Sequence, residues 1–382
     1  MILQDDWVSN HGTQALCAAL GMSGHSALFV GGCVRNALLG VPVADIDIAT
    51  DARPEVVSDI AEQAGFKVVP TGIDHGTVTV IAAGVLHEVT TFRRDVATDG
   101  RRAVVAYTDD IAEDAGRRDF TMNALYALPS GEVVDPLGGM ADLRARLVRF
   151  VGNPQQRIRE DYLRILRFFR FHAVYGDPTG GIDPEGLAAC AELADGIATL
   201  SHERIGAEVR KLLAAENPAP AVAAMAGSGV LPHVLPGSDV KALAPLIHLE
   251  DGLPPRWQRR LAVLGGTSDH LRLSRQEETD LSRVRAEIGS PLSAAALGWT
   301  LGTLPAQDVI LCRAALFEAA LPQDWHGEVS RGAQSVFPVS AADLMPALQG
   351  PDLGARLKSL QRRWLASGLT LDKRALLRGG DD

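Results

Sequence analysis

One stretch near the N-terminus constrains the fold of this chain more than any other. An apolar run at 27–30 predicts a short buried strand, and Gly31 and Gly32 follow it directly. Glycine lets the backbone approach another group closely, because it has no Cβ atom. Residues 34–39 have helical spacing, and Gly40 marks the end of the predicted helix. A strand, a glycine turn and a helix N-terminus together predict an anion-binding site.

Two carboxylates follow this turn, in the sequence Asp45-Ile46-Asp47-Ile48. On a strand, residues i and i+2 face the same way, so Asp45 and Asp47 share one face while the isoleucines face the core. Paired carboxylates repel each other unless cations lie between them, and Mg²⁺ both prefers oxygen ligands and bridges substrate phosphates. The combination predicts phosphoryl or nucleotidyl transfer with two Mg²⁺ ions. The alternative is an ordinary glycine turn followed by solvated acids at a strand edge.

The composition is that of a globular protein with two or three domains, since 382 residues include 46% hydrophobic and 22% charged side chains. No apolar run approaches the roughly 18 residues of a membrane span. The acidic N-terminus lacks the basic start and apolar core of a signal peptide. The cysteines are far apart and form no CxxC pair, so they indicate neither a zinc site nor a disulfide framework. We therefore expect a cytoplasmic protein; the cysteines are Cys17, Cys33, Cys190 and Cys312.

The net charge of −10 argues at first against a nucleic-acid partner. Net charge is a poor guide when charges are clustered, however, and arginine here greatly outnumbers lysine. Arginine is suited to bidentate contacts with phosphates and bases, so the composition permits a basic cleft on an acidic body. The clustered arginines are Arg93, Arg94, Arg101, Arg102, Arg117, Arg118, Arg157, Arg159, Arg164, Arg167 and Arg170.

The pattern along the chain changes from mixed to helical at about residue 140. Before that point, polar residues at 92–102 predict a mobile loop, and the other segments predict helices and strands. The predicted helices lie before residue 24 and at 53–64 and 109–118, and the predicted strands lie at 66–70, 77–82 and 85–91. After that point, 155–174 is the strongest predicted helix. The expected fold class is α+β, a small head with a mixed sheet followed by a long all-α part.

Four polar residues are spaced at three-residue intervals on the predicted helix 155–174. They are Asp161, Arg164, Arg167 and Arg170, and this spacing places them on one helix face. An Asp–Arg pair presents an acceptor beside a fork of donors, so it can read the edge of a base, with about 1–3 kcal/mol of discrimination for each good bidentate pair. The alternative is a solvated ladder of salt bridges.

A second polar cluster lies where a helix begins or bends. In it, Arg118 is a candidate clamp for a triphosphate, whereas Asp119 is expected to hold an arginine in place. Asn123, in the same cluster, is expected to bind the nucleotide. Glu88 lies on a predicted strand that could neighbour the strand of Asp45 and Asp47. It is a candidate third catalytic carboxylate, or else a salt-bridge partner.

Several motifs in one order resemble those of the class II tRNA nucleotidyltransferases, the CCA-adding enzymes, whose poly(A) polymerase relatives share the same head. The resemblance covers roughly residues 25–215. Its motifs are Gly31-Gly32-x-Val34-Arg35 with Asp45-x-Asp47, Arg117-Arg118-Asp119-Phe120-Thr121-x-Asn123-Ala124-Leu125, Asp135-Pro136-x-Gly138-Gly139, Glu160-Asp161-x-x-Arg164-x-x-Arg167, and Glu203-Arg204 with Glu208.

The resemblance implies a polymerase-β-like nucleotidyltransferase head at 1–139. It further implies a helical neck with base recognition at 140–215, and a helical body and tail that bind tRNA at 216–382. The family's flexible loop, which is tied to the switch to A addition, corresponds to 93–107. It is full length here, which disfavours relatives that add only CC. One departure is Asn36, where the family usually has Asp, and a structural role is expected for it.

The resemblance also assigns roles to single residues. It implies that Asp45 and Asp47 bind Mg²⁺, and that Asp161 and Arg164 form the protein template that pairs with CTP and then ATP. The remaining nucleotide contacts that we expect are Gly31, Gly32, Arg35, Arg118, Arg167 and Arg170.

The expected function is therefore template-independent addition of CCA to the 3′ end of tRNA, with CTP and ATP as substrates and Mg²⁺ as cofactor. A poly(A) polymerase is the alternative, and an RNA-binding protein without catalysis is a further one. No His-Asp dipeptide occurs, so we expect no phosphohydrolase domain. Basic clusters near the C-terminus either hold the tRNA backbone or are solvated helix faces; they are Arg256, Arg259, Arg260, Arg356, Lys358, Arg362 and Arg363.

Overall fold

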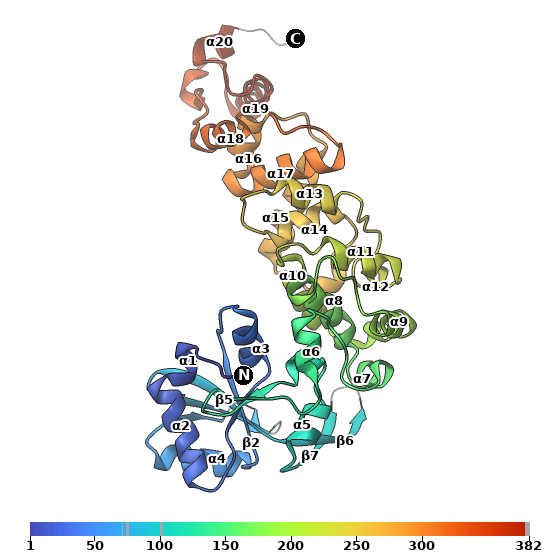
Figure 1. Ribbon diagram of the computed structural model, residues 1–382. Helices are drawn as coiled ribbons and strands as arrows, with labels where there is room; N and C mark the ends of the chain where they lie inside the picture. The colour runs from blue at the N-terminus through green and yellow to red at the C-terminus, as the bar shows by residue number, and fades with distance from the viewer. Residues whose placement is uncertain (71, 74–75, 100–101, 379–382) are drawn as a thin grey trace. The chain divides into compact units, whose positions relative to one another are not determined.

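The computed structural model describes residues 1–70, 72–73, 76–99 and 102–378, and describes only the backbone at 95–99 and 102–105 (Figure 1). Gly100 and Arg101, within the predicted mobile loop, lie outside the described residues. The chain divides into two compact units, unit 1 (Met1–Ser201 and Gly227–His233) and unit 2 (His202–Ala226 and Val234–Asp382). The predicted division into head, neck, body and tail is finer than these units and stays a prediction. No helix in the described ranges is both long and apolar enough to cross a bilayer.

Unit 1 is built on a mixed sheet, as predicted. Among the described residues, seven strands form it in the order β3-β4-β5-β2-β1-β8-β9. β2 and β5 are parallel, and the other neighbours are antiparallel. The strands are β1 (Leu28–Val30), β2 (Ile46–Thr50), β3 (Lys67–Val69), β4 (Thr77–Ala82), β5 (Val85–Thr91), β8 (Tyr126–Ala127) and β9 (Val133–Val134).

Helices cover this sheet, with α2 and α4 packed on each other and on β4 and β5 (Figure 1). Gly12 permits the close packing of α2, because a Cβ atom there would lie 2.3 Å from the carbonyl oxygen of Ala82. A cluster that includes Leu28, Val30 and Tyr126 forms the core beneath β1, β2 and β8. The helices of this part are α1 (Asp6–Ser9), α2 (His11–Met22), α3 (Gly32–Leu39), α4 (Pro54–Gln63) and α5 (Ile111–Gly116).

The predicted loop after Phe92 is a hairpin instead. Its strands β6 (Arg93–Asp99) and β7 (Arg102–Tyr107) pair in an antiparallel two-stranded sheet. The prediction relied on the lack of apolar alternation, which marks strands that bury one face. The pairing of two neighbouring segments rests on backbone hydrogen bonds, and polar side chains do not prevent it.

The prediction of one long helix at 155–174 is also wrong. The structure has two helices there, α7 (Pro154–Glu160) and α8 (Leu163–Tyr175). Asp161 has an extended backbone, and its carboxylate accepts a hydrogen bond from the backbone N–H of Leu163 at 3.1 Å. A local bond of this kind, from an Asp side chain to the N–H two residues on, competes with continuation of the previous helix. Asp161 therefore does not share a helix face with the arginines of α8.

The buried side of α8 packs on aromatic residues. The rings of Phe168 and Phe150 are stacked with their centroids 5.3 Å apart, and Phe120 contacts both. This packing leaves the arginines of α8 on the other side. The other elements of this region are α6 (Gly139–Arg144), α9 (Pro184–Glu192), η2 (Thr121–Asn123) and η3 (Ala194–Thr199).

The described chain beyond residue 201 is helical, as predicted. Its elements are α10 (His202–Leu213), α11 (Ala219–Gly227), α12 (Leu231–Val234), α13 (Leu243–Leu249), α14 (Trp257–Leu264), η4 (Asp269–Leu271), α15 (Arg275–Ile288), α16 (Ala294–Leu301), α17 (Thr303–Leu316), α18 (Trp325–Gln334), η5 (Ala341–Asp343), α19 (Gly350–Ala366) and α20 (Lys373–Arg378).

Two arginines of the predicted C-terminal basic clusters are enclosed in unit 2. Arg259 and Arg260 are 2% and 1% exposed, so neither expected role, an RNA contact or a solvated helix face, fits them. Arg260 donates to the Glu250 carboxylate at 2.7 Å and to the Leu213 carbonyl at 2.7 Å. Arg259 donates to Asp308 at 2.9 Å. Buried charges of this kind are tolerated only when they are paired with opposite charges.

Candidate active site

The glycine turn has the geometry that the sequence predicted. Gly31 has φ +71° and directly precedes α3, in a backbone conformation that L side chains rarely adopt. Its N–H donates to the Leu125 carbonyl at 3.0 Å, which ties the turn to the end of β8. The first amide groups of α3 have no partner within the helix, as at every helix start. The turn can therefore present backbone donors to an anion.

The carboxylates lie together on the neighbouring strands β2 and β5. Asp45 directly precedes β2, and Asp47 is paired with Glu88 of β5 in the parallel register. Ile46 and Ile48 are buried, so the three carboxylates lie on the opposite face of these strands. Glu88 thus neighbours the Asp45–Asp47 strand, as predicted. Burial first, and then the charges of Glu88 and Asp45, raise the pKa of Asp47 to about 6.

The raised pKa of Asp47 reflects its burial first, and then the two carboxylates beside it. Within the described ranges, no three His, Cys, Asp or Glu side chains converge so as to hold a metal ion by themselves. Mg²⁺ commonly takes only one or two protein carboxylates and completes its shell with water and substrate phosphates. The Asp45–Asp47 pair, with its excess of negative charge, fits a cation of this kind.

Arg118 lies over the glycine turn. A Cβ atom on Gly31 would be 3.2 Å from Nη1 of Arg118, so a larger residue would meet the guanidinium. Nε of Arg118 donates to the Tyr126 hydroxyl, and Nη2 donates to Asp114, each at 3.1 Å. The charge of Arg118 also acts on Asp47, whose pKa it lowers against the stronger effect of burial. Arg118 therefore joins the glycine turn to the carboxylates.

Arg35 of α3 lies beneath the turn and is almost fully buried. Its guanidinium donates to the side-chain oxygens of Asn36 and Asn123 and to the Tyr175 hydroxyl, and it lies 4.0 Å from the Tyr175 ring centroid. Burial lowers the pKa of Arg35. Asn36, at the position where the family usually has Asp, thus holds Arg35 and donates to the Pro42 carbonyl at 3.1 Å, which agrees with the structural role expected for it.

Asn123 and Asp119 connect the turn to α8. The amide of Asn123 accepts from Arg35 and donates to Asp119 at 2.8 Å, so its polar atoms are used within the protein. Asp119 accepts from Arg167 at 2.8 Å, which confirms the prediction that it holds an arginine in place. Arg167 and Arg170 both lie over the Phe171 ring, with their guanidinium carbons 5.1 Å and 4.6 Å from its centroid.

Arg164 is held by acceptors on three sides. It donates to Glu160 at 2.6 Å and to the carbonyl oxygens of Arg157 and Arg117 at 2.8 Å and 3.2 Å. Asp161 is half-buried, and its carboxylate accepts from the N–H of Leu163, the first residue of α8. The structure thus brings Asp161 and Arg164 to the junction of α7 and α8, through a helix break rather than a shared helix face.

Three residues that hold these arginines were not predicted. Asp114 is four residues before Arg118 on a predicted helix, a spacing at which side chains meet, so this partner was within reach of the sequence. Tyr126 and Tyr175 reach Arg118 and Arg35 only through the folding of the sheet and α8, and no local signal marks them.

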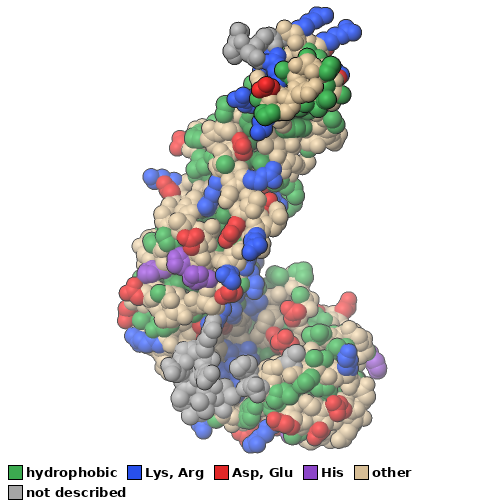
Figure 2. Space-filling view, turned by 180° about the vertical axis from the view of Figure 1, so that it is seen from behind, with side chains coloured by type: hydrophobic (Ala, Val, Ile, Leu, Met, Phe, Trp, Pro, Cys, Tyr) green, Lys and Arg blue, Asp and Glu red, His purple; other side chains and the backbone are tan. Residues whose placement is uncertain are grey.

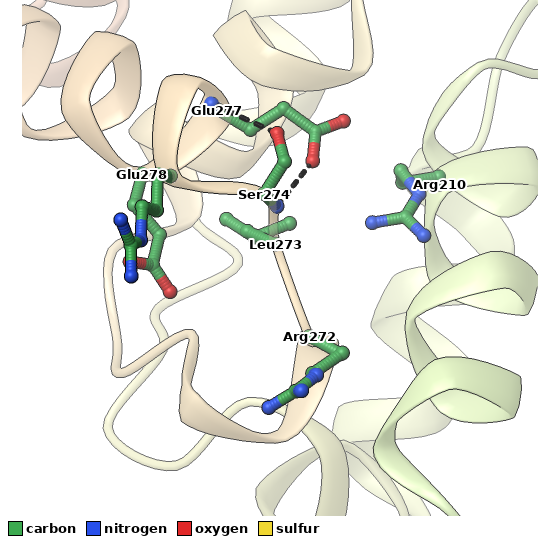
Figure 3. Close-up of a pocket in the computed structure, with 7 residues that line it drawn as sticks. Arg210, Arg272, Leu273, Ser274, Glu277 and Glu278 are labelled. Carbon is green, nitrogen blue, oxygen red and sulfur yellow. Dashed lines mark hydrogen bonds between the residues drawn. The ribbon is translucent and has the colours of Figure 1, made fainter.

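A separate cavity of about 660 Å³ lies within unit 2 (Figure 3). Figure 3 shows Arg210 across from the segment that begins α15, where Ser274 and Glu277 hydrogen-bond each other's backbone. The cavity combines cations and anions, since its lining comprises Arg210, Arg272, Leu273, Ser274, Arg275, Glu277 and Glu278.

Basic side chains are unevenly distributed on the surface. On the face drawn in Figure 2, Lys and Arg side chains lie in several separate groups, although the net charge is −10. Local positive charge can attract an anionic partner when the whole molecule is acidic.

Comparison with known proteins gives a consistent result along the chain. Residues 27–149 match the poly A polymerase head domain, and residues 181–241 match a domain described as a probable RNA and SrmB-binding site of polymerase A. CCA tRNA nucleotidyltransferase 1, mitochondrial, is 33% identical in Mus musculus and 34% identical in Homo sapiens, each over 96% of this chain and 89% of the relative. The crystal structure of the Bacillus stearothermophilus CCA-adding enzyme in complex with CTP has 30% identity and a TM-score of 0.72, covering 93% of this chain and 92% of that one. The chain therefore belongs to the family of CCA-adding tRNA nucleotidyltransferases.

Proposed function

We propose that this protein adds CCA to the 3′ end of tRNA, using CTP and ATP. The observation that carries the proposal is the convergence of Asp45, Asp47, the Gly31 turn and Arg118 in unit 1. The mouse and human relatives bear the name of this activity, and the related bacterial enzyme was solved with CTP. In each step the tRNA 3′-hydroxyl attacks the α-phosphate, a new P–O bond forms, and the bond to the leaving pyrophosphate breaks.

Asp45 and Asp47 are the proposed Mg²⁺ ligands, with Glu88 as a third carboxylate next to them. Mg²⁺ bound there would supply the positive charge that activates the attacking hydroxyl and neutralises the departing pyrophosphate. The protein's own contribution is to hold two anionic groups on a strand face that is partly shielded from water, ready for that charge.

The triphosphate seat consists of the Gly31–Gly32 backbone and Arg118, with Arg35 beneath it. Arg118 supplies a guanidinium nitrogen directly above the turn, and α3 supplies amide groups at its N-terminus. Arg35 is held by Asn36, Asn123 and Tyr175, so it contributes fixed charge below the phosphates. Fixed donors of this kind stabilise developing charge without rearrangement.

Base selection is assigned to Asp161 and Arg164, with Arg167 and Arg170 beside them. Glu160 and the two backbone carbonyls fix the orientation of the Arg164 guanidinium, and Asp119 does the same for Arg167. A fixed donor fork beside an acceptor can distinguish bases by their hydrogen-bonding edges. Unit 2 is proposed to hold the tRNA through its phosphate backbone and shape, because all tRNAs must be accepted.

The incorporation of labelled nucleotides tests this function. The protein is incubated with Mg²⁺, tRNA that lacks CCA, and CTP or ATP alone or together. We expect two C residues and then one A, with no further extension. Unlimited addition of A alone would indicate a poly(A) polymerase, and RNA binding without any incorporation would indicate a protein without catalysis. Chelation with EDTA should stop incorporation.

A further inference from the structure

The guanidinium of Arg118 is held on two of its three nitrogens. Nη2 and Nε meet the Asp114 carboxylate and the Tyr126 hydroxyl, and that hydroxyl in turn donates to Asp114 at 2.6 Å. The three groups therefore form a closed triangle, in which Oδ2 of Asp114 receives both Arg118 and Tyr126. Charge-assisted bonds of this type fix the plane of the guanidinium as well as its position.

The third nitrogen of Arg118, Nη1, is the one aimed at the glycine turn, 3.2 Å from the place of a Cβ atom on Gly31. Nη1 donates no hydrogen bond to any of the residues that the structure describes. Arg118 is 18% exposed at its side chain, whereas Asp114 is 1% exposed. The enclosed Asp114 carboxylate thus holds the guanidinium from the side of the core, and Nη1 faces the glycine turn.

Asp114 makes further contacts through its other oxygen. Oδ1 accepts from Arg117 at 2.8 Å and from the backbone N–H of Arg93 at 3.3 Å. Arg93 is the first residue of β6, so Asp114 also ties the base of the β6–β7 hairpin to the arginine above the turn. The positive charges of Arg118 and Arg117 lower the pKa of Asp114 against the effect of its burial, so it is a carboxylate at neutral pH.

We propose that Asp114 is a positioning residue for triphosphate binding, which acts through Arg118 with Tyr126 as the second holder. The inference rests on the proposed function, because it takes Arg118 as a triphosphate contact. The triphosphate is common to CTP and ATP, so loss of the clamp affects both nucleotides equally. It leaves the choice between them, and the affinity for tRNA, unchanged.

Two variants test the clamp, with a matched control. Asp114→Asn removes the charge at constant shape, and Tyr126→Phe removes only the hydroxyl. Glu113→Gln makes the same acid-to-amide change at the neighbouring, 39% exposed residue of α5. For each variant, KM for CTP and for ATP, kcat, tRNA affinity by filter binding and the midpoint of thermal unfolding are measured. Binding of inorganic tripolyphosphate is measured by calorimetry, and this readout requires no turnover.

We expect both KM values to rise by about tenfold or more in Asp114→Asn, which loses the charge that pairs with Arg118, and by less in Tyr126→Phe, which loses an uncharged acceptor of Arg118. Tripolyphosphate affinity should fall by the same factors, and Glu113→Gln should match the wild type. If Asp114→Asn does not fold, Tyr126→Phe carries the test. Unchanged tripolyphosphate affinity in a folded variant would overturn the proposal.

A double-mutant cycle separates positioning from general structural damage. Asp114→Asn should have less than about a twofold further effect on tripolyphosphate affinity once Arg118→Ala is present, because the group that it positions is gone. Equal effects in both backgrounds would refute action through Arg118. If wild-type protein binds tripolyphosphate but incorporates no nucleotide, the proposed function fails while the clamp is still tested.

Discussion

Arginine clusters have different surroundings in the two units. In unit 1, a carboxylate and a hydroxyl hold Arg118, and a carboxylate and two carbonyl oxygens hold Arg164, while part of each side chain stays exposed. In unit 2, Arg259 and Arg260 are enclosed with Glu250 and the neighbouring acid Asp308, and almost nothing of them reaches the surface. Arginines that are clustered in the same way along the sequence are thus partly exposed in unit 1 and part of the core in unit 2.

The comparison shows that exposure, and not clustering, decides what an arginine can do. A guanidinium that is held on one side and exposed on the other can contact a ligand. A guanidinium that is enclosed on all sides can contact only the protein. The consequence is that changes at the unit 1 site should alter chemistry at little expense of stability, and changes at the enclosed pairs should do the reverse. Four sets of variants test this contrast, beginning with the one for which we expect the greatest loss of activity.

Replacement of Asp47 by Asn should nearly abolish incorporation and yet stabilise the fold. Loss of a metal ligand is expected to lower kcat by at least about a thousandfold. Because the folded-state pKa of Asp47 is raised to about 6 from 3.8, its ionised form costs stability above that pH. In EDTA at pH 7.5, the Asn variant should therefore be more stable to urea, by up to about 3 kcal/mol.

The sign of this effect depends on pH. The protonated Asp47 favours the folded state fully below about pH 4, and this advantage is lost as the pH rises through about 6. The gain of the Asn variant should therefore vanish in acid, and Asp45→Asn provides a comparison at the exposed acid of the pair. A destabilised Asp47→Asn variant at pH 7.5 would contradict the picture of uncompensated negative charge.

Replacement of Arg260 by Met should have the opposite pattern. Glu250 would keep a buried charge with one partner fewer, which typically costs about 3–5 kcal/mol. Urea denaturation measures the loss, and Arg374→Met, at an exposed residue of unit 2, serves as the control. Folded Arg260→Met protein should keep KM and nucleotide selectivity. A specific loss of tRNA affinity, without loss of stability, would return Arg260 to the group of RNA contacts.

Replacement of Arg164 by Ala should blur the choice of nucleotide more than it slows the chemistry. Selectivity between CTP and ATP at each step should fall by about 10- to 100-fold, the value of one good bidentate base contact. The ratio of kcat/KM for CTP to kcat/KM for ATP at each step provides the measurement, with Arg159→Ala on α7 as an exposed control. Selectivity equal to that of the wild type would rule out the template role.

The smallest effects are expected in the unit 2 cavity of Figure 3. If Arg210 or Arg272 contacts a tRNA phosphate, its change to Ala should weaken tRNA binding several-fold and reduce the slope of log K against log salt by about 1. Glu278→Gln, on the same wall, should leave the slope unchanged or slightly steeper. An unaltered slope in both arginine variants would leave this cavity outside the tRNA-binding surface.

Much of the head could be predicted from local sequence patterns. The turn at Gly31 needs a positive φ, and the alternation around Asp45 and Asp47 fixes which side chains face the core, so both features are visible in a few residues. The predicted strands at 77–82 and 85–91 match β4 and β5 residue for residue. Local spacing is sufficient where the physical cause is also local.

The features that prediction missed depend on distant or competing partners. Arg259 meets Asp308, which is 49 residues away, so no spacing rule connects them. At the break, the Asp161 side chain bonds to the N–H of Leu163, and this local bond competes with helical continuation; periodicity alone does not reveal such competition. Tyr175 likewise becomes a holder of Arg35 only when α8 packs beside α3.

The parallel register of β2 and β5 has a consequence for altering this enzyme. Asp47 and Glu88 stand opposite each other because both strands keep the same alternation of inward and outward side chains. One residue inserted between Asp45 and Asp47 would turn an isoleucine toward the substrate and an acid toward the interior. Anyone who lengthens this strand to admit a new substrate can therefore add residues only in pairs.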